Sequence, residues 1–404
     1  MKFIRRSLEP VLTRAAREFP AVALTGPRQS GKTTLLRHLF GPTHLFVSFD
    51  LPDVRQAALT DPRGFLALHP PPVVLDEIQH VPDLLPYIRE AIDRRRTRAG
   101  QFILTGSQNI LVMERVAETL AGRVAPLHLL PLSRREAVGR PGAPLPWSAR
   151  ATPAARHPTL RALWQDLLRG AYPELVAHPR RDRHLWHASY VQTYLERDVR
   201  TLRQVGDLTQ FQAFLRLLAA RSGQLLDLSG LARDLGVAVN TAKAWLSVLE
   251  ATYQVFVLRP FFANVGKRLV KTPKVYFTDV GTLCYLAGLR EPTHAAAGPM
   301  GGAIFETAVV SEIFKAIVHQ GEVPRLYFWR TATGVEVDLV VDRGTELEPI
   351  EITQSATPRP AMAAGIVRLR QDLGDRVGRG YVVHPGTIRL PLAPGVLALP
   401  FADL

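Results

Sequence analysis

The chain has 404 residues, 47% of them hydrophobic and 21% charged, which is enough apolar material for roughly two to four domains with cores of their own. A single cysteine, Cys284, excludes an intrachain disulfide and is typical of a reducing cytoplasm. The apolar runs are short and broken by charges, so the sequence predicts a soluble, cytoplasmic protein with no signal peptide, no membrane span and no membrane partner.

The chain is basic, with 50 lysines and arginines against 36 acids and a formal net charge of +14. This charge favours an anionic polymer as a partner, because phosphate contacts release counterions and steer association. Arginine can also be frequent because of the base composition of a genome, and the 32 prolines fit that explanation. Nucleic acid and a protein therefore both stay as candidate partners. Two basic clusters, 93–98 and 180–184, are either phosphate contacts or solvated helix faces.

Residues 21–34, AVALTGPRQSGKTT, place an apolar strand before a glycine-framed loop, and leucines at helical spacing follow. This is a P-loop in its usual order of strand, loop and helix. In such a loop the backbone N–H groups bind phosphate oxygens, Lys32 reaches the β- and γ-phosphates, and the Thr33 hydroxyl is placed for Mg²⁺. The positive end of the helix dipole points at the same anion. The predicted nucleotide-binding residues are Gly26, Pro27, Arg28, Gln29, Ser30, Gly31, Lys32, Thr33 and Thr34.

A second motif lies at 72–77, PVVLDE, which reads as a short buried strand that ends in two carboxylates. In an open parallel sheet the carboxyl ends of the strands form the ligand crevice. Asp76 is expected to hold Mg²⁺, directly or through water, and Glu77 to polarise the attacking water. The alternative is that both acids are merely exposed at a strand end.

A third strand is predicted at 101–105, QFILT, and it stops at a Gly-Ser-Gln turn. There a polar side chain, Ser107 or Gln108, could sense the γ-phosphate and hold the attacking water. Taken alone, the segment would be an ordinary strand followed by a turn.

Together the three elements resemble the AAA-superfamily branch of P-loop ATPases. Four segments are more closely similar to a large prokaryotic family of AAA-type ATPases with a C-terminal domain of unknown function: 26–34, 75–79 (LDEIQ), 104–108 (LTGSQ) and 120–123 (LAGR). The likeness extends over most of the chain. It implies ATP and Mg²⁺ as cofactors, and an arginine, here Arg123, that acts on the γ-phosphate from the same subunit or from a neighbour in a homo-oligomer. Equally, Arg123 could be a surface ion-pair partner.

The predicted ATPase domain occupies 1–137. Residues 138–158 are rich in Gly, Pro, Ala and Arg with little periodicity, which is typical of a linker. Leucines then recur at helical spacing, and 159–206 is predicted to be a helical segment.

Residues 207–300 have the outline of a winged helix-turn-helix: a helix, a second helix closed by a glycine turn, a third helix over 240–250, and a strand. In a DNA-binding version the last helix enters the major groove. It would offer Thr241, Lys243 and Ser247, of which only Lys243 is charged, so a structural or protein-docking role is about as well supported. The basic stretch 267–274 would supply phosphate contacts.

The last segment, 301–404, begins with a predicted helix over 304–318, and three strands follow at 325–329, 335–341 and 349–352. Glu306, Asp338 and Glu351 lie on these elements, an order that resembles the restriction-endonuclease-like fold. The resemblance implies that the acids bind Mg²⁺ and that a lysine stabilises charge on the scissile phosphate.

This possible degenerate nuclease site departs from the pattern, because Thr353 stands where the lysine is expected. Arg330 and Arg343 are the nearest cations in sequence that could replace it. We therefore expect little or no nuclease activity, and the alternative is a hairpin whose acids are solvated.

The sequence predicts an α/β protein of three parts: a P-loop AAA-type ATPase core, a helical and winged-helix middle, and a restriction-endonuclease-like α/β domain at the C-terminus. The favoured function is a Mg²⁺-dependent, ATP-hydrolysing switch or motor. The alternatives are an ATP-regulated DNA-binding protein with little turnover and an ATP-regulated nuclease.

Overall fold

The computed structural model describes residues 3–106, 116, 118–148, 150, 153–154, 156–195, 208–261 and 272–404. The chain forms two compact units. The first consists of Met1–Leu132, Ala251–Tyr253 and Ile317–Glu322; the second consists of Ser133–Glu250, Gln254–Ala316 and Val323–Leu404.

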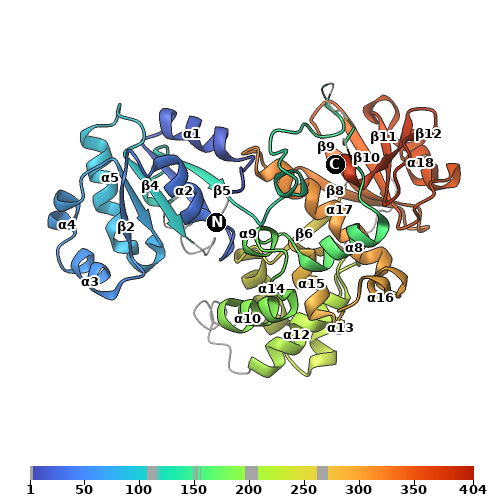
Figure 1. The fold of residues 1–404 in the computed structure, drawn as a ribbon, viewed down its shortest axis with the longest axis horizontal. Helices are drawn as coiled ribbons and strands as arrows, with labels where there is room; N and C mark the ends of the chain where they lie inside the picture. The colour runs from blue at the N-terminus through green and yellow to red at the C-terminus, as the bar shows by residue number, and fades with distance from the viewer. Residues whose placement is uncertain are drawn as a thin grey trace. The chain divides into compact units, whose positions relative to one another are not determined.

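The first unit contains a five-stranded parallel sheet with the strand order β2-β3-β4-β1-β5 (Figure 1). Its strands are β1 (Ala21–Thr25), β2 (Leu45–Ser48), β3 (Val73–Asp76), β4 (Phe102–Gly106) and β5 (Val124–His128). The three inner strands β1, β3 and β4 are buried along their whole length. A strand covered on both faces needs an apolar run rather than an alternating one, and the sequence has such runs at these positions.

Helices cover both faces of this sheet: α1 (Glu9–Glu18), α2 (Lys32–Phe40), α3 (Pro52–Thr60), α4 (Pro62–Leu68) and α5 (Leu85–Arg94), with the short 3₁₀ turns η1 (Ile78–His80) and η2 (Pro82–Leu84). The side chains of β1 alternate between two cores. Ala21 and Ala23 pack in a core with α3, α4 and α5, while Val22 and Leu24 pack in a core with α1 and α2. Because all five strands are parallel, their carboxyl ends meet at one edge of the sheet.

The second unit is built on an eight-stranded mixed sheet with the order β12-β13-β11-β10-β9-β8-β6-β7. Its strands are β6 (Val255–Pro260), β7 (Lys274–Phe277), β8 (Leu326–Arg330), β9 (Glu336–Asp342), β10 (Leu347–Ile352), β11 (Gly380–His384), β12 (Leu390–Ala393) and β13 (Val396–Pro400). The segments 207–300 and 301–404 share this sheet, because β6 pairs with β8 through Arg259–Tyr327 and Pro260–Phe328. Strands from these two segments, which were predicted as separate domains, thus lie in one sheet.

The helices of the second unit are α7 (Arg134–Ala137), α8 (Leu160–Arg169), α9 (Pro173–Ala177), α10 (Arg183–Tyr190), α12 (Leu208–Ala220), α13 (Leu228–Leu235), α14 (Val239–Ala251), α15 (Val280–Leu286), α16 (Pro292–Ala297), α17 (Gly301–Val318) and α18 (Ala364–Leu373). Single turns complete it: the π-turn η3 (Val191–Leu195) and the 3₁₀ turns η4 (Pro360–Ala363), η5 (Gly374–Arg376) and η6 (Phe401–Asp403). No helix among the described residues is long and apolar enough to cross a membrane.

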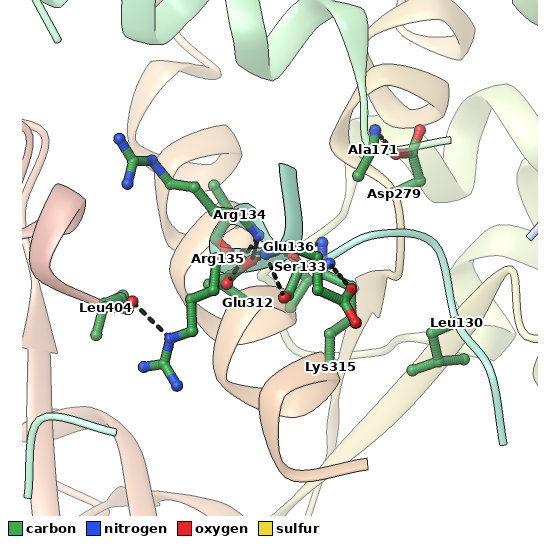
Figure 2. A network of polar contacts seen from close by, with 12 residues as sticks. Leu130, Ser133, Arg134, Arg135, Glu136, Ala171, Asp279, Glu312, Lys315 and Leu404 are labelled. Atoms are coloured by element: carbon green, nitrogen blue, oxygen red, sulfur yellow. Dashed lines mark hydrogen bonds and ion pairs between the residues drawn. The ribbon is translucent and has the colours of Figure 1, made fainter. Parts of the chain in front are cut away.

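A buried polar network anchors α7 in the second unit (Figure 2). Ser133 and Glu136 form a capping box at the start of the helix. The carboxylate of Glu312, which is only 2% exposed, accepts hydrogen bonds of 2.8 and 2.9 Å from the backbone N–H of Arg134. The Arg135 Nε donates to the Leu404 carbonyl at 2.7 Å. The network thus ties α7 to α17 and to the C-terminal residue Leu404.

Candidate nucleotide-binding site

The loop between β1 and α2 has the backbone of a phosphate-binding loop. Gly26, Gln29 and Gly31 all have positive φ angles, of 152°, 64° and 92°. A Cβ on Gly26 would lie 2.1 Å from the Leu129 carbonyl oxygen, so this position accepts only glycine. The loop follows the carboxyl end of β1, and α2 begins at Lys32 with its N-terminus open toward the loop.

Lys32 is held over this loop. Its side chain is largely buried (6% exposed), and its Nζ donates to the carbonyls of Gly26 at 2.9 Å and Pro27 at 3.0 Å. The hydroxyl of Ser30 is completely buried and has no hydrogen-bond partner among the residues that the structure describes. A fixed ammonium group and an unsatisfied hydroxyl in one loop fit an anion such as a phosphate.

The predicted magnesium ligands are in contact. Thr33 Oγ1 donates to Asp76 Oδ2 at 3.1 Å, and Thr105 on β4 donates a short hydrogen bond to the other oxygen of Asp76. Burial removes water from this carboxylate and raises the pKa of Asp76 above its usual value. A hydroxyl beside a desolvated carboxylate fits Mg²⁺, since this cation prefers oxygen ligands and would offset the cost of burying the charge.

Glu77 lies at the turn that follows β3. Its backbone is left-handed, with a φ of 58°, and its N–H donates to Thr105 Oγ1 at 3.2 Å. The side chain of Gln79 donates a short hydrogen bond to its carboxylate. A left-handed backbone at a non-glycine residue costs on the order of 1 kcal/mol. The contacts of Glu77 with Thr105 on β4 and with Gln79 in the turn hold it in this conformation and so set the direction of its side chain.

Arg6 is a site residue that the sequence did not indicate. It is 4% exposed, and its two terminal nitrogens donate to the carbonyls of Ser30 at 2.8 Å and Leu130 at 2.7 Å. It therefore fixes the phosphate loop from the segment before α1. Local sequence carried no signal, because its acceptors lie 24 and 124 residues away.

Three further residues of the first unit that the sequence did not indicate, Thr25, His128 and Tyr253, meet where β1 leads into the phosphate loop. The hydroxyl of Thr25, the last residue of β1, is 2.8 Å from His128 Nδ1 and 2.6 Å from the hydroxyl of Tyr253. Tyr253 is also 2.9 Å from the same histidine nitrogen and has a φ of 59°. Burial lowers the pKa of His128, which keeps the ring neutral near pH 7.

Arg123 lies away from the loop. Arg123 directly precedes β5, which runs parallel to β1 with Val124 beside Ala21 and His128 beside Thr25. The arginine is therefore at the amino ends of the strands and the phosphate loop at their carboxyl ends, roughly 16 Å apart along the strands. Arg123 pairs with Asp93, Nε to Oδ1 at 2.7 Å and Nη2 to Oδ2 at 3.1 Å. A role on the γ-phosphate of the same subunit does not fit this geometry, because the arginine would have to cross the length of the sheet. Ser107 and Gln108 lie outside the described residues.

In the second unit the structure brings Glu306, Asp338 and Glu351 together. Burial and, after it, the charge of Glu306 raise the pKa of Asp338 to about 7. Burial and the neighbouring Asp338 raise the pKa of Glu351 to about 10, and the two carboxyl groups share a hydrogen bond. Within the described ranges, no group of three or more histidine, cysteine or acidic side chains is arranged to hold a metal ion.

The cation of this cluster is Lys274 on β7, not Arg330 or Arg343 as the sequence suggested. Its Nζ lies 2.9 Å from Glu306 and 2.5 Å from Glu336. Arg330 instead pairs with Glu336 at 3.0 Å and Arg343 with Glu348 at 3.2 Å. Since Lys274 is only 4% exposed, the prediction that it adds phosphate contacts at the surface is wrong; residues 267–271 lie outside the described residues.

A strand, a glycine-bearing loop and a helix, with a second strand of the same parallel sheet that ends in a buried aspartate, define a P-loop nucleotide-binding protein. Three family models match the chain: an AAA domain over residues 18–138, a domain of unknown function (DUF8612) over 160–293, and a domain of unknown function (DUF4143) over 301–404.

Among known proteins, the chain is similar to uncharacterized protein Rv2008c of Mycobacterium tuberculosis and uncharacterized protein Mb2031c of Mycobacterium bovis. Each is 33% identical over 399 residues, which cover 98% of this chain and 83% of the relative. The chain belongs to the family of these proteins, P-loop AAA ATPases with a C-terminal DUF4143 domain.

Among solved structures, the Walker-type ATPase PABY2304 of Pyrococcus abyssi is similar to 70% of this chain over 96% of its own. The TM-score is 0.45 and the identity 14%, a level of likeness that adds nothing on function.

Replacing Arg6 should loosen the phosphate loop. Arg6→Ala leaves two buried carbonyls without charged donors, so we expect the free energy of unfolding to fall by about 2–4 kcal/mol and ATP affinity to fall with it. Urea unfolding and ATP titration measure both. Arg5→Ala is the matched control, because Arg5 is exposed and pairs only with Glu9 in the interactions described; equal behaviour of the two variants would contradict the role of Arg6.

Proposed function

We propose that this ATPase is a Mg²⁺-dependent switch or motor that hydrolyses ATP and acts with nucleic acid or a protein partner. The observation that carries the proposal is the hydrogen-bonded chain Thr33–Asp76–Thr105, which joins the phosphate loop's helix to the ends of β3 and β4. It places a hydroxyl and a carboxylate side by side, where the metal of a nucleotide would be bound.

Each residue of the site then has a role. Bound Mg²⁺ would neutralise charge on the phosphates and polarise the bond that breaks. Lys32 and the loop N–H groups would hold the phosphates, and Thr33 and Asp76 would hold the metal. Glu77 accepts a proton from the attacking water, with its direction set by Thr105 and Gln79. Ser107 or Gln108 is proposed to report the γ-phosphate.

A nucleic-acid partner is supported by the middle of the chain. The helices α13 and α14 are joined by a turn at Gly236, whose φ is 65°, and the antiparallel pair β6–β7 follows, which suits a winged helix. Lys243 on α14 is exposed, whereas Trp245 and Leu249 are buried in the core as expected.

The partner class is tested by measuring the ATPase rate with single-stranded DNA, duplex DNA and RNA. If about six phosphates are contacted, the concentration needed for stimulation should rise on the order of 10³-fold between 50 and 200 mM salt. Stimulation that is indifferent to salt, or none at low salt, would point to a protein partner instead.

For Arg123 we infer the role of ion-pair partner of Asp93, because the pair is bidentate and lies far from the loop of its own subunit. Arg123→Ala should therefore change the ATPase rate by less than about threefold, as expected for an exposed pair. A loss of about 10³–10⁵ would instead identify an arginine finger. If mixing Arg123→Ala subunits with Lys32→Ala subunits then restored turnover, Arg123 would act on the nucleotide of a neighbouring subunit in a homo-oligomer.

The C-terminal acids give a second candidate, an ATP-regulated nuclease, which Lys274 favours because it supplies the missing cation. Two features oppose it: Lys274 is bonded to carboxylates, and Asp338 and Glu351 share a proton. We expect no cleavage of labelled single- or double-stranded DNA with Mg²⁺ or Mn²⁺. Cleavage that Asp338→Ala abolishes would establish the nuclease and overturn this expectation.

A further inference from the structure

Two cavities in the second unit share a wall. The first has a volume of about 340 Å³ and lies between α8, α10, α15 and the segment 289–291; the second, of about 370 Å³, lies between α10, α12 and α15. The shared wall is the pair His184 and Tyr285, whose ring centroids are 5.0 Å apart with the planes at 68°. Each cavity is within the size range of small-ligand sites.

The first cavity is cationic. Its charged lining comprises Arg169, Arg181, Arg183 and Arg290 against Asp182 and Glu291. Asp182 is already engaged, because its carboxylate caps α10 by accepting from the N–H groups of His184 at 2.8 Å and Leu185 at 3.1 Å. Arg181 is paired with Glu174. Three arginines then remain against two acids, so the lining keeps a net positive charge.

One guanidinium nitrogen of these arginines has no hydrogen-bond acceptor among the described residues. The Nη1 atom of Arg169 is shielded from solvent and has no hydrogen-bond partner in the part of the chain that the structure describes. A buried guanidinium donor of this kind costs free energy unless an acceptor enters. Arg183 is held at the rim by a hydrogen bond of 2.6 Å from its Nη2 to the Arg290 carbonyl. An anion with several oxygens, such as a phosphate, fits this lining.

The second cavity has a different character. It is lined by the amides of Gln192 and Gln212, by the aliphatic side chains of Leu215 and Leu286, and by Arg216. Amides beside apolar surface suit a flat heterocycle with donors and acceptors on its edge, as a nucleobase has. The aromatic pair between the cavities offers a surface for stacking.

We propose that the two cavities bind one nucleotide unit, its phosphate in the arginine-lined cavity and its base in the amide-lined one, at a site separate from the phosphate loop. The bound nucleotide is either a free nucleotide or one residue of a single-stranded nucleic acid. The exposed Arg180, next in sequence to the lining residue Arg181, adds positive charge beside the cavity, which favours the strand.

The test uses the full-length Lys32→Ala protein, so that the phosphate loop does not capture the probe, without ATP or Mg²⁺ and at about 100 mM salt. The probes are fluorescein-labelled DNA and RNA single strands of about twelve nucleotides, followed by anisotropy, and AMP followed by calorimetry. Binding of the strands or of AMP is expected, and which of them binds names the source. If none of the three probes binds, the proposal is overturned. The proposed ATP hydrolysis at the phosphate loop is not affected by that result, because it is measured in a separate experiment.

The variants Arg169→Gln, Arg290→Gln and Tyr285→Leu should each weaken binding about tenfold. Arg325→Gln removes an exposed arginine elsewhere in the same unit and should have no effect. An equal loss in that control would mean non-specific attraction, and a loss confined to Lys243→Gln would place the strand on α14; either result overturns the proposal. Arg290 is exposed, so its variant is expected to fold even if Arg169→Gln does not.

Discussion

Lys32→Ala should weaken nucleotide binding, whereas Glu77→Gln should bind ATP and fail to cleave it. Lys32 carries the one ammonium group of the phosphate loop, so its loss removes charge from the place where phosphates bind. The glutamine keeps the shape of Glu77 and its contacts with Thr105 and Gln79, but it cannot accept a proton. Loss of a general base lowers turnover by about 10²–10⁴.

Binding and turnover are measured separately, by titration with a fluorescent ATP analogue and by phosphate release. Arg14→Ala and Glu18→Gln, both exposed on α1, are the matched controls and should behave as the wild type. Equal loss of binding in Lys32→Ala and Glu77→Gln would contradict the separate roles.

Lys274→Met should destabilise the second unit strongly. The lysine is buried between Glu306 and Glu336, and removing one partner of a buried ion pair costs about 3–5 kcal/mol. The raised pKa values of Asp338 and Glu351 already make the folded state bind more protons than the unfolded state, so stability falls as pH rises between about 4 and 10. Without the cation these pKa values rise further, and the variant should lose more stability at pH 8 than at pH 5.

Urea unfolding at both pH values measures the effect, and the double variant Lys274→Met/Glu336→Gln should recover part of it because one uncompensated carboxylate is gone. Lys243→Met, at an exposed position, is the control. A free energy of unfolding within about 0.5 kcal/mol of wild type at both pH values would show that Lys274 does not hold the cluster together.

The sequence predicted the elements of the first unit well, because the chemistry of the site is local. The strand before the loop, the strand ending at Asp76 and the strand before Gly106 all lie within a residue or two of their predicted positions. Buried parallel strands require apolar runs, and a phosphate loop requires glycines at fixed offsets, so each element carries its own signal.

What the sequence missed depends on contacts between distant residues. Tyr253 reaches Thr25 over 228 positions, and Lys274 reaches Glu306 over 32. Lys274 was interpreted as part of a basic surface because its neighbours in sequence are basic. In the structure it lies on β7, the edge strand of the sheet, and contacts Glu306 and Glu336. The strands β11, β12 and β13 were not predicted either.

The central claim is that the site around Lys32, Thr33 and Asp76 hydrolyses ATP with Mg²⁺. The most direct measurement is phosphate release from ATP by the purified wild-type protein, with Mg²⁺ and with excess EDTA, and with Lys32→Ala as the blank. The account predicts steady release that requires Mg²⁺ and disappears in the blank. Release that persists in EDTA, or that Lys32→Ala retains, would contradict it.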